Sequence, residues 1–140
     1  SLTRATKGLR DLGLFKELSD AELTELLNQA YPLDAITLYL LPRLAARAAQ
    51  NERTLFGFLY ASDMETPLRP ADLFDYFEPA MRNDTGVGGT YRSWLETESA
   101  ISKAESDLEI AALKTVCLLS NCSRQRAKYN RRILKEITIV

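Results

Sequence analysis

Residues 107–119 read DLEIAALKTVCLL, and this stretch decides the fold. Apolar residues recur here at the spacing of one helix face, and a second apolar set lies on another side of the same helix. The first set is Leu108, Ala111, Ala112, Val116 and Leu119, and the second is Ile110, Leu113 and Cys117. A helix that is apolar nearly all round belongs inside a core. We therefore expect an all-α protein built around this helix.

Helix signals also mark the chain before this stretch. Residues 19–22 (SDAE) form a capping box, in which the serine hydroxyl caps the helix and the glutamate reaches back to the serine amide. Asp34 and Asn51 are predicted caps of two further helices, and Pro70 fits the first turn of another, expected to end at Phe77. Pro42 predicts a kink or a break, because proline lacks the amide hydrogen and its ring clashes with the preceding turn.

Length and composition fit one helical domain. The chain has 140 residues, of which 46% are hydrophobic and 26% charged, and its formal net charge is −1. Such a balance is typical of a globular protein and gives no overall attraction to nucleic acid or membrane. No apolar run approaches the ~20 residues needed to span a bilayer, so we expect no membrane partner. We predict one irregular bundle of about six to eight helices over residues 1–140, with a short N-terminal helix or arm at 1–18.

The ends of the chain and its cysteines suggest a cytoplasmic piece of a larger protein. The chain begins with Ser1 and no initiator methionine, and it ends on the apolar β-branched run 137–140 (ITIV). Cys117 and Cys122 would point in different directions on one helix, so we expect no bridge between them. We interpret both as reduced thiols, with Cys117 in the core.

Candidate catalytic and metal sites are weak. The chain contains no histidine, which excludes Ser-His-Asp and Cys-His catalysis within it and, with no CxxC pair, argues against zinc. Asp72, Asp75 and Glu78 recur every third residue, and we interpret them as a solvated helix face. Residues 86–89 (GVGG) lack the strand and the Gly-Lys-Ser/Thr of a phosphate loop, so we expect a surface loop. We assign no catalytic residue and no metal ligand.

The C-terminal residues 123–140, predicted as a basic helix, carry six basic side chains and one acidic side chain. Their charge is six minus one, or +5, so the rest of the chain carries −6. Four basic residues share a predicted helix face and are candidate contacts to DNA or RNA: Arg124, Lys128, Arg131 and Lys135. The alternative is a solvated helix that docks on the acidic segments 63–84 or 96–109 of the same domain.

Residues 50–59 (QNERTLFGFL) set polar side chains beside an aromatic run. The polar members are Gln50, Asn51, Glu52 and Arg53. A buried glutamate or arginine is costly unless it is paired. One hypothesis is an internal hydrogen-bond cluster that fixes helix packing, and the other is a surface offered to a catalytic domain elsewhere in a larger protein.

An ordered series of motifs covers roughly residues 23 to 120. It comprises 31–33 (YPL), 41–44 (LPRL), 50–59, 75–77 (DYF), 92–98 and 113–119. The series resembles the helical region that follows the nucleotide-binding core of large bacterial P-loop ATPases of the AAA/STAND kind. Tyr31 stands where that family has histidine, and Gly57 stands where it has serine.

This resemblance implies that ATP and Mg²⁺ bind to a core elsewhere in the larger protein and that this chain holds no cofactor. It implies that Tyr31 and Pro32 lie near the nucleotide, with Pro32 packing near the adenine as a lid proline does. The change from histidine to tyrosine puts the Tyr31 contact in doubt. It also implies that a winged-helix-like segment starts near the C-terminus.

Three hypotheses for function follow. The first is a non-catalytic helical lid or linker of a multidomain P-loop ATPase, which couples the nucleotide state to neighbouring domains by rigid-body movement around residues 50–53. The second is a nucleic-acid-binding module that uses the basic C-terminal helix. The third is a helical protein-interaction domain that forms homo-oligomers through its helix faces.

Overall fold

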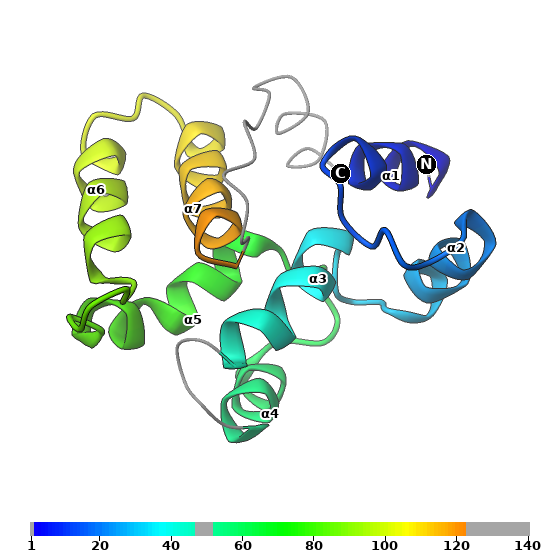
Figure 1. The fold of residues 1–140 in the computed structure, drawn as a ribbon, viewed down its shortest axis with the longest axis horizontal. Helices are drawn as coiled ribbons and strands as arrows, with labels where there is room; N and C mark the ends of the chain where they lie inside the picture. Colours follow the sequence, from blue (N-terminus) through cyan, green and yellow to red (C-terminus); the bar gives the residue numbers. More distant parts are fainter. Residues whose placement is uncertain (1, 47–51, 123–140) are drawn as a thin grey trace.

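The computed structural model describes residues 2–46 and 52–122, which form seven α-helices (Figure 1). The helices are α1 Leu2–Asp11, α2 Asp20–Gln29, α3 Ala35–Leu44, α4 Glu52–Ala61, α5 Pro70–Asn83, α6 Tyr91–Ile101 and α7 Asp107–Cys122. In this part of the chain the only β-type pairing is an isolated bridge between Leu33 and Leu68. The prediction of an all-α protein with about six to eight helices is confirmed.

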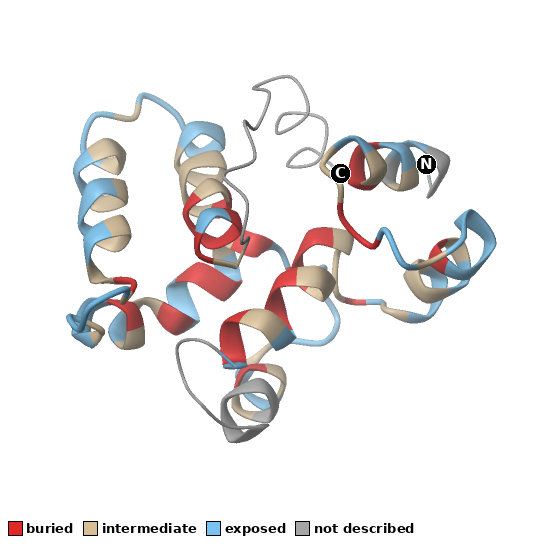
Figure 2. Cartoon of the chain, viewed as in Figure 1, coloured by how far each residue is buried: buried red, intermediate tan, exposed pale blue. Residues whose placement is uncertain are grey.

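Helix α7 is central over its second half only. It packs against α3, α5 and α6, and its buried residues are Thr115, Cys117, Leu118, Leu119 and Asn121. Its first turn faces solvent, as the pale blue end of α7 in Figure 2 shows. The predicted apolar sides of α7 are therefore buried unequally, since its buried residues all lie between Thr115 and Asn121.

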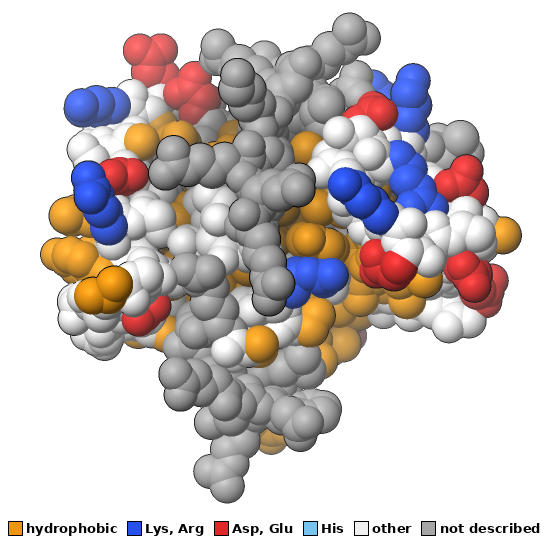
Figure 3. All heavy atoms as spheres, in the orientation of Figure 1, with side chains coloured by type: hydrophobic (Ala, Val, Ile, Leu, Met, Phe, Trp, Pro, Cys, Tyr) orange, Lys and Arg blue, Asp and Glu red, His pale blue; other side chains and the backbone are white. Residues whose placement is uncertain are grey.

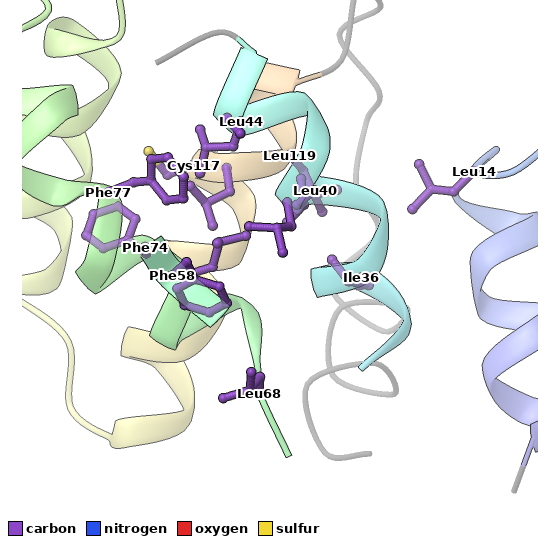
Figure 4. Packing of buried hydrophobic residues seen from close by; sticks show 14 of the residues in the cluster. Leu14, Ile36, Leu40, Leu44, Phe58, Leu68, Phe74, Phe77, Cys117 and Leu119 are labelled. Atoms are coloured by element: carbon purple, nitrogen blue, oxygen red, sulfur yellow. The ribbon is translucent and has the colours of Figure 1, made fainter. Parts of the chain in front are cut away.

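The core lies between α3, α5 and α7, and among the described side chains of α4 the ring of Phe58 joins it. Side chains from the three helices converge in Figure 4, where Phe58 of α4 lies against the same group. Burying each such side chain contributes roughly 1.5–3 kcal/mol relative to leaving it exposed. Helices of ten residues are marginal on their own in water, so this packing stabilises them more than their propensity does.

A short turn joins α1 to α2 and packs on α3. Gly13 and Phe15 adopt the left-handed conformation, with φ of 71° and 54°. Phe15 is buried, and its ring meets Tyr39 of α3 edge to face at 5.3 Å between centroids. The Arg10 side chain holds the turn, donating to the Phe15 carbonyl at 2.6 Å and to the Leu18 carbonyl.

Two prolines lie inside helices, contrary to the expected boundaries. Helix α3 passes Pro42 and ends at Leu44, and α5 passes Pro79 and ends at Asn83 rather than at Phe77. A break at Pro42 is therefore wrong. Both prolines are exposed, so water can hydrate the carbonyl that loses its donor, and each helix loses little by continuing. The predicted winged-helix start lies in residues 123–140, outside the described residues.

Candidate functional site

Tyr31 and Pro32 belong to a pair of loops that hold two helix starts together. We call residues 31–34 and 65–69 the loop clamp. The Leu68 amide donates to the Pro32 carbonyl at 2.7 Å, and the Asp34 amide donates to the Leu68 carbonyl at 3.1 Å. The Tyr31 hydroxyl donates to the Glu65 carbonyl at 3.0 Å. The clamp thus ties the start of α3 to the start of α5.

The two residues of the predicted nucleotide contact differ in exposure. Pro32 is buried in the clamp and follows a cis peptide bond, whereas Tyr31 is 66% exposed. A ligand that approaches these two residues from solvent therefore meets Tyr31 before Pro32. Pro32 serves in this conformation as packing between the two loops, and its carbonyl is already an acceptor for Leu68.

Asp34 anchors the clamp to α3. It is the N-cap residue, and its carboxylate accepts the Thr37 amide at 2.8 Å, as the sequence predicted. Burial raises the pKa of Asp34, while the hydrogen bonds from Thr37 and the charge of Arg69 offset part of that rise. Burial therefore makes the ionised form of Asp34 costly, and the hydrogen bond from Thr37 reduces that cost.

The polar run at residues 50–53 is only partly visible. Helix α4 begins at Glu52, the position that a cap at Asn51 predicts. Gln50 and Asn51, and the side chains of Glu52 and Arg53, lie outside the described residues. The same holds for the basic residues predicted to contact nucleic acid: Arg124, Lys128, Arg131 and Lys135.

The three spaced carboxylates of α5 serve structural roles. Asp72 accepts the Arg69 amide at 2.9 Å and so caps the helix start. Asp75 pairs with Lys114 of α7 at 2.6 Å, and Glu78 pairs with the arginine one turn later at 3.7 Å. Asp72 and Asp75 are exposed, in agreement with the predicted solvated face.

The glycine-rich segment is a surface loop closed by Asp84. The Asp84 carboxylate accepts the Thr90 amide at 2.8 Å and the Thr90 hydroxyl at 3.0 Å. Gly88 has φ of 75°, and a Cβ at Gly89 would collide with the Asp84 backbone. The Gly89 amide donates to the Gly86 carbonyl, so the loop uses this donor internally.

A small polar cluster joins α6 to α7. The Asn121 side-chain amide donates to the Ser93 hydroxyl at 2.9 Å and to the Cys117 carbonyl at 3.0 Å. The Cys117 thiol is buried, and burial raises its pKa, with the nearby charge of Glu98 adding to the rise. A thiol with a raised pKa is a poor nucleophile, so this cluster fixes packing. No disulfide joins Cys117 to Cys122, as predicted.

One side of α2 carries a shallow groove of about 510 Å³. Its lining residues are Leu18, Ala21, Glu22, Glu25, Leu26 and Gln29. The capping box of α2 is present, and the Ser19 amide and hydroxyl lower the pKa of Glu22. The spacing of residues along α2 could not reveal this groove, because a groove depends on which neighbouring elements leave the helix uncovered.

None of the helices in the described residues has the length and apolarity to cross a bilayer. The described residues also bring together no group of three or more cysteine, aspartate or glutamate side chains suited to a metal ion. Comparisons of the chain with protein-family models, with curated proteins and with solved structures gave no match.

Proposed function

We propose that this chain is a non-catalytic helical lid or linker domain of a multidomain P-loop ATPase. The observation that supports the proposal is the loop clamp, with exposed Tyr31 at its surface and two helix starts behind it. ATP and Mg²⁺ belong, by the resemblance, to the P-loop core of the larger protein. This chain contributes surfaces for other domains.

The clamp favours mechanical coupling for a physical reason. A force on Tyr31 passes through its hydroxyl to residue 65, and through the paired backbones at Leu33 and Leu68. Both α3 and α5 carry core residues and pack on α7. Packed cores shift as units and do not deform continuously, so contact at one loop would move the helices together.

The test is site-specific photo-crosslinking of the full chain in cells that produce it. Tyr31 is replaced by the photo-reactive p-benzoylphenylalanine, and the captured polypeptide is identified by mass spectrometry. We expect a polypeptide with a G-x-x-x-x-G-K-[ST] phosphate loop, or such a region of the same polypeptide. Its yield should differ between samples supplied with ATP and with ADP.

Val87 is the matched control position. Val87 is fully exposed and belongs to the loop between α5 and α6. That loop lies on the opposite side of the molecule from α2 in Figure 1. The proposal fails if Tyr31 captures no P-loop polypeptide, or if Tyr31 and Val87 capture it equally in both nucleotide states.

A nucleic-acid-binding module is the second candidate, favoured by the charge of +5 on residues 123–140. The measurement is a fluorescence anisotropy titration of the full chain with a short DNA duplex at low and moderate salt. Phosphate-driven binding weakens steeply as salt rises. Replacement of Arg124, Lys128 and Arg131 by glutamate should then abolish it, whereas unchanged binding in that variant would exclude this candidate.

A further inference from the structure

Helix α2 has a half-covered apolar side. Among the described helices it packs chiefly on α1, and Leu23 is its one fully buried residue. Leu18 and Leu26 touch the core cluster yet stay half-buried, and together with Ala21 they form the apolar part of the groove. The groove therefore keeps apolar surface in water that a partner side chain could cover.

The groove is bordered by acid. Glu22 and Glu25 line it, and the chain has no lysine or arginine between Lys16 and Arg43. Asp20 at the start of α2 forms an ion pair with Arg10, at 3.1 Å between the guanidinium and the carboxylate. Glu22 instead accepts the Ser19 amide, and Glu25 accepts the Gln29 side-chain amide, so the recorded partners of both carboxylates are uncharged donors.

In Figure 3, acidic and basic side chains both appear on the side of the molecule where α1 and α2 lie, and further acidic side chains lie over α6 and α7. An acidic border repels phosphates, which argues against nucleic acid or an anionic membrane as the occupant. An apolar floor with an acidic border is complementary to leucine-like side chains flanked by lysine or arginine.

We infer that the α2 groove is a docking site for a basic amphipathic helix of a partner protein. Apolar side chains of the partner, spaced at three and four residues, would cover Leu18, Ala21 and Leu26. Its basic side chains would meet Glu22 and Glu25. Since α2 has ten residues and a helix rises 1.5 Å per residue, a partner helix of about 10–14 residues matches its length.

The test is a fluorescence anisotropy titration of the full chain with a labelled 14-residue leucine–lysine peptide. Its leucines stand at i, i+3, i+4 and i+7, and a scrambled peptide of the same composition is the control. We expect the amphipathic peptide to bind at least about tenfold more tightly than the scrambled one, because only it presents one apolar face.

Two chain variants locate the site. Glu22→Gln with Glu25→Gln removes both charges while glutamine keeps the capping box, and Ala21→Gln fills the exposed floor. Each should weaken binding about threefold to tenfold, which is the scale expected of exposed charge pairs and lost apolar contact. The matched control is Glu105→Gln with Glu109→Gln, the same charge change at the start of α7, which should leave binding unchanged.

Three results would overturn the inference. The first is equal binding of the two peptides, which would mean attraction by charge alone. The second is an equal loss in the α2 and α7 double variants. The third is self-association of the chain in sedimentation equilibrium that Ala21→Gln abolishes, which would assign the groove to a second copy. Circular dichroism of each variant confirms that it is folded before binding is compared.

Discussion

Gly57 and Tyr76 show how one residue of a sequence motif is fixed by a distant neighbour. A Cβ at Gly57 would lie 2.5 Å from the Tyr76 hydroxyl, and the Tyr76 ring packs edge to face on Phe58 and on Phe77. Serine, the residue of the resembling ATPases at this position, would meet the same hydroxyl. Glycine at 57 is therefore coupled to tyrosine at 76.

This coupling gives the first prediction. Gly57→Ala gains helix propensity worth roughly 0.5–1 kcal/mol but must displace the Tyr76 ring. In a Tyr76→Phe background the hydroxyl is gone, and the same alanine should stabilise the fold by about that amount. Urea unfolding of the two single variants and the double variant measures the coupling. Additive effects would mean that the hydroxyl does not restrict position 57.

Asp34 gives a prediction about pH. Its folded pKa is raised by burial, so its ionised form is penalised in the folded state. That penalty is present above the folded pKa and disappears as the pH falls through it toward the unfolded value, about 3.9. Asparagine is an equally good cap without charge. Asp34→Asn should therefore be at least as stable as the native chain at pH 7.

The control for Asp34 separates charge from capping. Asp34→Ala loses the bond to Thr37 and should cost about 1 kcal/mol at pH 7. Urea unfolding at pH 7 and pH 4 compares the three proteins. The free energy of unfolding of the native chain should rise relative to that of Asp34→Asn when the pH falls from 7 to 4. A native chain that becomes less stable relative to Asp34→Asn on acidification would contradict the raised pKa.

At the scale of single elements, local signals predicted helix starts well and helix ends poorly. Capping by Ser19 and Asp34 and the first-turn position of Pro70 are confirmed, because each depends on residues within one turn. The end of α5 could not be predicted, since it depends on the burial of Met81, four residues past the expected end. Packing of that side chain outweighs the bond lost at Pro79.

The capping box of α2 carries the third prediction. Ser19→Ala removes the acceptor of the Glu22 amide and should destabilise the protein by about 1 kcal/mol. The lowered pKa of Glu22 adds a pH signature. Its contribution is present above the unfolded pKa and is lost as the pH falls through the folded pKa.

Glu22→Gln tests that signature. The glutamine oxygen can still accept the Ser19 amide but carries no charge. The stability of the Glu22→Gln variant should therefore vary less between pH 6 and pH 3 than that of the native chain. Thermal unfolding across this range is the measurement. Parallel curves for the native chain and Glu22→Gln would mean that the charge contributes nothing at this helix start.

At the scale of the whole molecule, long-range pairing is what the sequence could not reveal. The loop clamp joins Leu33 to Leu68, thirty-five positions apart, and neither loop carries a periodic pattern that indicates its partner. The resemblance directed attention to Tyr31 and Pro32, but only the folded chain separates the exposed ring from the buried one. Local patterns thus predicted the helices, and tertiary contacts decided the candidate surface.

The α1–α2 hairpin, which is α1, α2 and the turn between them, contacts α3 through Phe15, and its residues Leu9, Leu14 and Leu23 are buried in the shared core cluster. Phe15 meets the Tyr39 ring on one side, and the Arg43 guanidinium lies 3.7 Å from the centroid of the same ring. Helix α2 carries the proposed docking groove, so the stability of the packing between this hairpin and the core determines whether the groove moves with the core. Local opening of a hairpin costs less than global unfolding where few contacts cross the boundary.

Phe15→Ala should therefore loosen the hairpin before it unfolds the core. Large-to-small changes at buried phenylalanine cost roughly 3–5 kcal/mol, and most of this loss should fall on α1 and α2. Native-state hydrogen exchange should show faster exchange over residues 8–27, with α5 and α7 protected as before. Phe15→Gly is the matched variant, because φ of 54° favours glycine over alanine by about 1 kcal/mol or more. It should be the more stable of the two, and equal acceleration of exchange in α7 would mean instead that the hairpin and the core unfold as one cooperative body.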